Sequence, residues 1–263
     1  FAGTAAAIGH KVRLYETKGE LGGHLNVMKL LPTREGWQTA IDNLVKRTQK
    51  HNVDITINWT PEPEELTDEV VIVATGSYWT RTGYSPYRPE RAGIPIFGDT
   101  KVVDISTAIL ESSRNPQYLG KKVVIIDETG DYLPLGLSEI LGSAGVDLEL
   151  ISPRPFVGSE TQRTLDMPHL LPRLKKLNVK FSALSFVEKI AGNDVHTYDI
   201  WGGPTRVIEE VESVVIAMTR LPNDHFYLDN TENIAGMKRI GDVLAPRKIE
   251  AVIFEAEKTA RTL

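Results

Sequence analysis

The sequence contains no cysteine. Disulfides, thiolate nucleophiles, zinc–thiolate sites and cysteine-ligated iron–sulfur clusters are therefore excluded from these residues. The sequence also lacks an apolar run of membrane-span length and, at its first residues, the pattern of a signal peptide. We therefore expect no membrane span and a cytoplasmic location.

Basic residues are fewer than acidic ones, with 30 Lys and Arg against 35 Asp and Glu. The formal net charge is -5, so no strong positive field favours binding to nucleic acid. The six histidines show no metal-ligand spacing, and no G-x-S-x-G or comparable nucleophile motif is present,. These absences predict no metal site within the chain and leave no candidate nucleophile.

The pattern of apolar residues indicates an α/β fold. Short β-branched runs alternate with helical stretches, as in parallel sheets with crossover helices. The strongest predicted strands are 11–16, 69–76, 121–128 and 212–219, and the weaker ones are 53–59, 146–152 and 179–190. The predicted helices are 36–52, 132–145, 168–178 and a last stretch that continues to the C-terminus.

Two α/β units in tandem account for the order of these elements. Residues 11–76 end in ATG and residues 121–219 end in AMT, after a similar succession of strands and helices. The stretch 85–99 between them is rich in Pro and Gly, as a crossing between domains would be.

A first candidate site follows the strand KVRLYE. Glu16 stands at the end of this strand, where a dinucleotide-binding fold holds the adenosine ribose, although a solvated strand-end Glu would look the same. Gly22 and Gly23 mark a turn in which the backbone passes close to a phosphate or merely to the neighbouring chain. His24 could donate a hydrogen bond there.

Two further turns could border a nucleotide. VIVATGS ends in small residues that permit close approach, by a ligand or by packed backbone. In IGDVLAP, Asp242 stands before an Ala-rich helix, either as a plain N-cap or beside amides that face an anion. Trp201, in YDIWGG, could be a stacking platform, but an aromatic that packs on its turn is the favoured expectation.

The second unit differs from a pyridine-nucleotide domain at one turn. After the strand VVIID comes ETGDYLPLGLSE, where G-x-G-x-x-G would be expected,. The carboxylates Asp127, Glu128 and Asp131 crowd this turn and would repel a pyrophosphate. We therefore expect that this unit does not bind NAD(P)H in the usual way.

Together these features resemble the C-terminal part of the trimethylamine dehydrogenase family, which includes dimethylamine and histamine dehydrogenases and is related to 2,4-dienoyl-CoA reductase. The resemblance runs through nearly the whole chain in family order. The matching stretches are YETKGELGGHLN, LPTREGW, VIVATGSYWTRTG, KKVVIIDETGDYLPLGLSEILGSAGVDLELIS, YDIWGG, TRLPNDHFYLDN and IGDVLAPRKIEAVIFEAEKTA.

The resemblance implies two Rossmann-like FAD/NAD(P)-binding-type domains, the second inserted in the first. Residues 1–82 plus 235–263 would form the ADP- or FAD-binding domain, and residues 99–233 the inserted, degenerate NAD(P)-binding-type domain. FAGTAAAIGHKV matches the later part of the first helix of the family. We therefore expect that the first strand and the glycine loop precede Phe1, and that the chain is a fragment truncated at its N-terminus.

The resemblance also assigns roles. Glu16 would contact the ribose, Gly22, Gly23 and His24 would line the nucleotide, and Thr75, Gly76 and Asp242 would border it. The FMN, the 4Fe–4S cluster and the amine would sit on an upstream barrel, which leaves no catalytic residue here. This fragment alone is then expected to be inactive and to bind ADP weakly at best. An electron-transfer flavoprotein and a second copy of the complete protein are the expected partners.

Two other functions stay open on the sequence. A FAD- and NADPH-dependent reductase of the dienoyl-CoA type would need an intact second glycine loop. A non-catalytic nucleotide-binding or partner-docking module would need the chain to be a natural product that starts near Phe1.

Overall fold

The computed structural model describes residues 1–263, and the chain divides into two compact units. Unit 1 consists of Phe1–Asn26, Gly36–Tyr78 and Arg220–Leu263, and unit 2 of Val27–Glu35 and Trp79–Thr219. The segment Val27–Glu35 thus belongs to unit 2, although it lies inside the sequence expected for the first domain. The assignment of the two units as ADP/FAD-binding-type and NAD(P)-binding-type stays a prediction.

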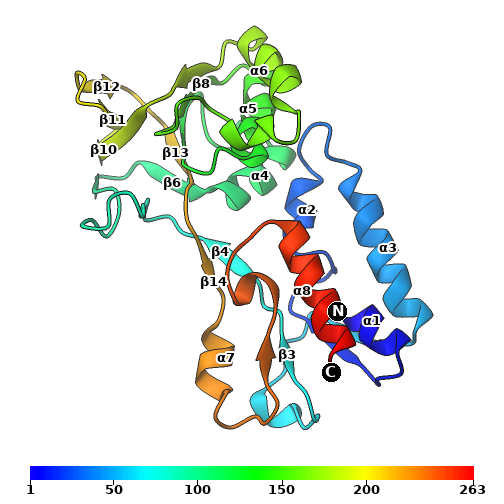
Figure 1. Ribbon diagram of the computed structural model, residues 1–263. Coiled ribbons are helices and arrows are strands. Elements are labelled where there is room, and N and C mark those ends of the chain that lie inside the picture. The colour runs from blue at the N-terminus through cyan, green and yellow to red at the C-terminus, as the bar shows by residue number, and fades with distance from the viewer. The chain divides into compact units, whose positions relative to one another are not determined.

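Unit 1 combines helices with short two-stranded sheets (Figure 1), of which β1–β2 and β3–β15 are parallel. Strand β1 pairs with β2, β3 pairs with β15, and β4 pairs with β14. Its helical elements are α1 (Ala2–Ala7), α3 (Trp37–Lys50), η1 (Pro63–Glu65), α7 (His225–Asn230), η3 (Gly241–Val243) and α8 (Ile249–Arg261), and α2 (Leu25–Met28) crosses into unit 2. Its strands are β1 (Arg13–Glu16), β2 (Asp54–Ile57), β3 (Ile72–Val73), β14 (Arg220–Pro222) and β15 (Lys238–Arg239), and β4 (Ser77–Trp79) ends at the boundary.

Polar contacts join three helices of unit 1. Glu257 of α8 accepts hydrogen bonds from the Thr4 hydroxyl of α1 at 2.7 Å and from the Arg47 guanidinium of α3 at 2.8 Å. These bonds hold the pKa of Glu257 below its usual range against the opposing effect of burial. Both chain ends lie in this unit, beside α1 and α8 (Figure 1).

Unit 2 contains two sheets. The first is parallel and has five strands in the order β6-β13-β7-β8-β9, and the second has four strands in the order β12-β11-β10-β5. The strands are β5 (Ile96–Phe97), β6 (Lys101–Asp104), β7 (Lys122–Asp127), β8 (Asp147–Ile151), β9 (Lys180–Ser182), β10 (Ser185–Ala191), β11 (Asp194–Asp199), β12 (Arg206–Ile208) and β13 (Ser213–Ala217). The helices are α4 (Ile105–Arg114), α5 (Tyr132–Ser143), η2 (Ser159–Gln162) and α6 (Met167–Lys176).

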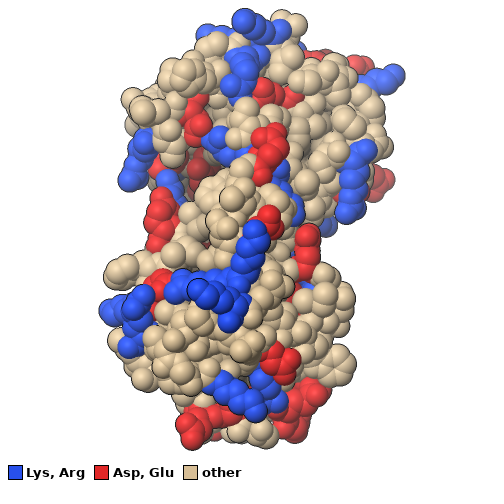
Figure 2. Space-filling model, turned by 90° about the vertical axis from the view of Figure 1, so that its right-hand side faces the viewer, with Lys and Arg blue, Asp and Glu red and all other residues tan.

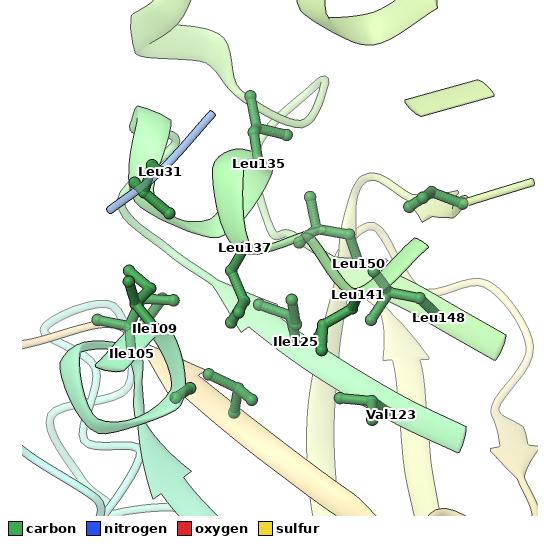
Figure 3. Close-up of a cluster of buried hydrophobic side chains, with 14 of the residues drawn as sticks. Leu31, Ile105, Ile109, Val123, Ile125, Leu135, Leu137, Leu141, Leu148 and Leu150 are labelled. Carbon is green, nitrogen blue, oxygen red and sulfur yellow. The ribbon is translucent and has the colours of Figure 1, made fainter. Parts of the chain in front are cut away.

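The parallel sheet of unit 2 is covered on both faces. Every residue of β13 and all but the first of β7 are buried, which matches the continuous apolar runs typical of parallel strands. Side chains from β7, β8, α4 and α5 fill one core beside Leu31 (Figure 3). Val123 and Ile125 of β7 belong to this core.

Most predicted elements of unit 2 are confirmed, as are the strand at 11–16 and the helices at 36–52 and at the C-terminus. Three expectations were wrong in detail. The predicted strand 69–76 pairs only over β3, because its partner β15 is two residues long. The run 179–190 is divided between two sheets as β9 and β10. Trp201, between β11 and β12, is 79% exposed and so does not pack on its turn.

Candidate nucleotide site

Glu16 closes β1, as the sequence predicts. The strand pairs in parallel with β2, with Glu16 opposite Ile57. One carboxylate oxygen of Glu16 accepts the Lys18 N–H at 2.8 Å. A carboxylate has about four lone-pair sites, so this bond leaves capacity to accept ribose hydroxyls.

The turn that follows β1 requires glycine at two successive positions. Gly22 has φ +127° and Gly23 has φ +53°. Residues other than glycine rarely adopt positive φ angles. A Cβ on Gly22 would also stand 2.9 Å from the Asn26 amide, whereas no atom lies within 4 Å of a Cβ position on Gly23. The backbone at Gly23 is therefore open to a neighbour.

The side-chain amide of Asn26 has a hydrogen-bond partner for its nitrogen but none for its oxygen. Its amide nitrogen donates to the Leu21 carbonyl at 3.1 Å. Its side-chain oxygen is buried without a hydrogen-bond partner, which is uncommon for a buried polar atom. A polar ligand bound beside Gly22 and Gly23 could donate a hydrogen bond to this Asn26 oxygen.

Hydrogen bonds connect His24 with Asp242 through Ser77. The Nε2 atom of His24 lies 3.0 Å from the Ser77 carbonyl oxygen, and because a carbonyl only accepts, Nε2 carries the proton. The Ser77 hydroxyl donates to Asp242 Oδ2 at 3.0 Å. The structure therefore brings together two of the predicted residues that are more than two hundred positions apart.

Asp242 is held by two further donors. Arg220 Nη1 donates to Oδ2 at 2.7 Å, and the Arg247 N–H donates to Oδ1 at 3.0 Å. Burial lowers the pKa of His24, and the nearby charge of Arg220 adds to this effect. The neighbourhood of Ser77 therefore contains an imidazole with a lowered pKa and a carboxylate in an ion pair with Arg220.

Asp242 is not the N-cap of the Ala-rich helix, which corrects one of the two readings of IGDVLAP. Helix α8 begins at Ile249, with Lys248 as its N-cap, and Asp242 lies in the short η3 turn. The N–H of Gly241, which has φ +74°, donates to the Glu255 carboxylate at 2.6 Å. Pro246, which lacks an N–H, lies between η3 and the start of α8, and the second reading, in which amides beside Asp242 face an anion, stays a prediction.

Thr75 and Gly76 lie at the edge of the same cluster. The Thr75 hydroxyl donates to the Asn223 carbonyl at 2.5 Å, and the Asn223 N–H donates to the Gly76 carbonyl at 2.9 Å. Gly76 has φ +78°, and no atom lies within 4 Å of a Cβ position on it. The backbone at Gly76, like that at Gly23, is exposed to a neighbour.

The residues fit an adenine nucleotide in their donor and acceptor types. Glu16 offers a carboxylate for ribose hydroxyls, the Gly23 and Gly76 backbones are accessible, and Asn26 has a free buried acceptor. Asp242 is already bonded to three donors, so its capacity for a ligand hydroxyl is small. The roles assigned to the seven predicted residues stay predictions.

Sequence reasoning did not single out the partners of Asp242. Ser77, Arg220 and Arg247 each donate to its carboxylate. The only signal for Arg220 in the sequence is its position directly after the apolar run SVVIAMT, where a charged side chain stands next to a strand end. Pairing across 22 residues could not be inferred from that position.

Charge distribution, helix composition and the placement of acidic and His side chains add three observations. Acidic and basic side chains are interspersed over the face in Figure 2. No helix combines the length and the apolar character needed to cross a bilayer. No group of three or more His, Asp or Glu side chains is arranged to hold a metal ion.

The fold is a mixed α/β arrangement with parallel sheets that resembles the FAD/NAD(P)-binding, Rossmann-like domains of thioredoxin reductases. The thioredoxin reductase of T. acidophilum superposes on 100% of this chain and 92% of its own, with a TM-score of 0.64 and 16% identity. At this identity the likeness establishes the fold alone.

Sequence identity is higher for a demethylase and an amine dehydrogenase than for the thioredoxin reductase, and so is the TM-score of the dehydrogenase. The chain is 25% identical over 293 aligned positions to the "Probable N-methylproline demethylase" of Rhizobium meliloti (strain 1021), which covers 97% of this chain and 40% of that protein. The structure of histamine dehydrogenase from Rhizobium sp. 4-9 superposes on 100% of this chain and 42% of its own, with a TM-score of 0.89 and 25% identity. The chain thus spans about two fifths of the length of these proteins. A scan against protein-family models finds no match.

Proposed function

We propose that the chain is the nucleotide-binding part of an iron–sulfur flavoprotein oxidoreductase that oxidises an amine, as trimethylamine, dimethylamine and histamine dehydrogenases do. The observation that carries this proposal is the likeness to histamine dehydrogenase over the entire chain, with a TM-score of 0.89. The sequence resemblance at GGHLN, at the turn after VVIID and at GD-x-x-AP supports the same assignment.

In this proposal unit 1 holds ADP, or FAD in the alternative. Glu16 accepts hydrogen bonds from the ribose hydroxyls, and the open backbone at Gly23 and Gly76 allows the diphosphate to approach, while Gly22 shapes the turn beside it. His24 borders the site through its ring, whose Nε2 donates to the Ser77 carbonyl, and Thr75 and Asp242 support the strand ends around it. Since Asp242 already has three donors, a ligand without a ribityl chain suits it better, which favours ADP.

The chemistry of such an enzyme would depend on groups outside these residues. FMN and a 4Fe–4S cluster would supply amine oxidation and electron transfer to an electron-transfer flavoprotein. The chain contains no Cys to ligate a cluster. The task of the present residues is then to bind and orient the nucleotide.

Calorimetry with ADP tests the nucleotide role. We expect weak but saturable binding of ADP to the 263-residue chain, because the acceptor at Glu16 is in place. The variant Glu16→Ala should lose about ten- to a hundredfold in affinity, since a hydrogen bond to a charged group contributes roughly 1.5–3 kcal/mol. Glu64→Ala, an exposed carboxylate elsewhere in unit 1, is the matched control and should bind as the wild type does.

Two outcomes would count against the proposal. Unchanged ADP affinity in Glu16→Ala would show that the nucleotide, if bound, does not use the end of β1. Oxidation of NADPH by a complete protein that contains this chain would favour the reductase alternative.

A further inference from the structure

The parallel sheet of unit 2 has a point at which its strand order reverses direction. From β7 the chain continues to β8 and β9, which lie on one side of β7 in the sheet. It then returns to β13, which pairs with β7 on the other side, next to β6. In open α/β sheets, ligands bind outside the carboxyl ends of the strands at such a point. The turn from Glu128 to Asp131, which connects β7 to α5, lies at this position.

The carboxylate of Asp127 uses the hydrogen-bond donors of this turn. Its Oδ1 atom accepts the Gly130 N–H at 2.8 Å and the Thr129 hydroxyl at 2.8 Å. Asp127 is completely buried, with 0% of the residue exposed. A backbone N–H in a glycine turn at the start of a helix is the kind of donor that binds a phosphate in related folds, and here it is already bonded.

The chain itself fills the space over the turn. Gly130 has φ +65°, and a Cβ on it would stand 2.4 Å from Ser159 Oγ and 2.9 Å from Arg154 Cδ. Arg154 Nε donates to the Glu128 carbonyl at 2.9 Å, and the Glu160 N–H donates to the Gly130 carbonyl at 2.9 Å. The loop after β8 is therefore bonded directly onto the turn and leaves no room for a pyrophosphate.

Several polar atoms remain unsatisfied around the turn. Asp127 Oδ2, Glu128 Oε2 and Ser159 Oγ are all buried without a hydrogen-bond partner. Buried polar atoms are nearly always paired in native proteins, so such a concentration at one turn is unusual. The turn is therefore lined by buried polar and acidic side chains and is not closed by apolar packing.

We propose that the Asp127 carboxylate is an internal anion that occupies the phosphate position of the β7–α5 turn. Unit 2 then keeps a dinucleotide-type sheet but binds no pyridine nucleotide, because its own side chain satisfies the donors that would hold the ligand. When this carboxylate is removed, the ligand that the position accepts is a small carboxylate such as formate. The proposal concerns unit 2 and does not depend on ADP binding by unit 1.

Rescue by formate is the first test. In Asp127→Ala the Gly130 N–H and the Thr129 hydroxyl lose their acceptor, so sodium formate at neutral pH should raise Tm by about 2–4 °C relative to sodium chloride at the same ionic strength. Asp127→Asn keeps an acceptor oxygen and is the matched control, for which formate and chloride should act alike. Equal effects of formate and chloride on Asp127→Ala would overturn the proposal.

Hydrogen exchange of the wild-type chain with NADPH is the second test, and it does not require the alanine variant to fold. Amide exchange in residues 128–132 should be unchanged at saturating NADPH. Protection at these residues would show that the dinucleotide enters the turn and would refute an internal anion. Changes confined to unit 1 would concern the adenine nucleotide site alone, so failure of either proposal can be recognised separately.

Discussion

The guanidinium of Arg34 stacks on the ring of Tyr132, with its central carbon 3.6 Å from the ring centroid. The same guanidinium forms an ion pair with Asp166 at 2.6 Å. The Tyr132 hydroxyl donates to the Pro32 carbonyl at 2.7 Å. Short-range contacts of three kinds thus fasten the segment Val27–Glu35 to the start of α5 and to the residue before α6.

Removing the Tyr132 hydroxyl should weaken this attachment. Tyr132→Phe keeps the ring under Arg34 but leaves the Pro32 carbonyl without its donor, and a loss of about 1 kcal/mol in the free energy of unfolding is expected. Urea unfolding followed by circular dichroism measures it. Tyr87→Phe, a side chain that is 75% exposed, should leave the midpoint unchanged. An equal midpoint for Tyr132→Phe and the wild type would show that the hydroxyl contributes nothing net.

Asp127 should make unit 2 less stable as the pH rises. Burial raises the pKa of Asp127 from 3.8 to about 6, against the opposing hydrogen bonds of Thr129 and Gly130. The folded state therefore binds the proton more tightly than the unfolded state, and the stability that the protonated form provides is lost as the pH rises from about 4 to about 6.

Replacement of Asp127 by Asn should remove this dependence. Asn keeps the acceptor oxygen and cannot ionise, so Asp127→Asn should be more stable than the wild type by up to ~3 kcal/mol at neutral pH. The advantage should shrink below about pH 4, where the wild-type carboxyl is protonated. Urea midpoints measured across this range check the prediction, and a constant difference at every pH would contradict it.

Asp104 should have the opposite pH dependence. It is the N-cap of α4, where its carboxylate accepts the Thr107 N–H at 2.9 Å. Although burial opposes the effect, the bonds from Thr107 and Arg81 hold its pKa below the usual value of 3.8. Its contribution is therefore present above about pH 4 and is lost as the pH falls through the folded pKa.

Asp104→Ala tests this cap. The variant should lose about 1–2 kcal/mol at neutral pH and less in acid, where the wild-type carboxyl is also protonated. Asp99→Ala, an exposed aspartate in the preceding loop, should change stability little at either pH. A loss for Asp104→Ala that is as large in acid as at neutral pH would mean that the cap does not act through its charge.

Arg220 should influence the titration of His24. Burial is the largest cause of the lowered pKa of His24, and the positive charge of Arg220 contributes to it while Asp242 opposes it. Arg220→Ala removes a like charge and frees the carboxylate, so the pKa of His24 should rise. A pH titration of the His24 ring protons by NMR measures the shift, with Lys258→Ala as the control for loss of an exposed cation in unit 1. A pKa of His24 that stays constant or falls in Arg220→Ala would contradict this electrostatic account.

The elements of unit 2 follow closely from local sequence pattern. VVIID and SVVIA are buried strands because continuous β-branched runs suit a sheet covered on both faces, and YLPLGLSEILGS forms a helix with Asp131 as its N-cap. These features depend on residues that are close in the chain. The α/β fold could therefore be predicted before the structure.

The contacts that complete the candidate site depend on distant residues. Asp242 receives its donors from Ser77, Arg220 and Arg247, of which Ser77 lies 165 positions away. The capping reading of Asp242 failed because the chain makes a separate turn at η3 before α8 begins. Local propensity cannot report which side chains meet across such separations.

Leu31 illustrates the same limit for domain boundaries. It is fully buried, and a Cβ on Gly136 of α5 would stand 3.1 Å from its Cδ1 atom. The close approach of helix backbone to this leucine identifies Val27–Glu35 as part of unit 2. In the sequence the same residues are a Pro-containing stretch between two predicted elements of the first domain, and nothing local reveals their partner.

The discontinuity of unit 2 restricts how its gene segment can be exchanged. A recombination event that carried only codons 79–219 to another gene would leave behind Leu31 and Arg34, and with them part of the core and the stack on Tyr132. The protein encoded by the recipient gene would have a cavity beside α5, where the Leu31 side chain packs in this chain. Lineages should therefore inherit the two segments together, and substitutions at positions 31 and 136 should be correlated among descendants.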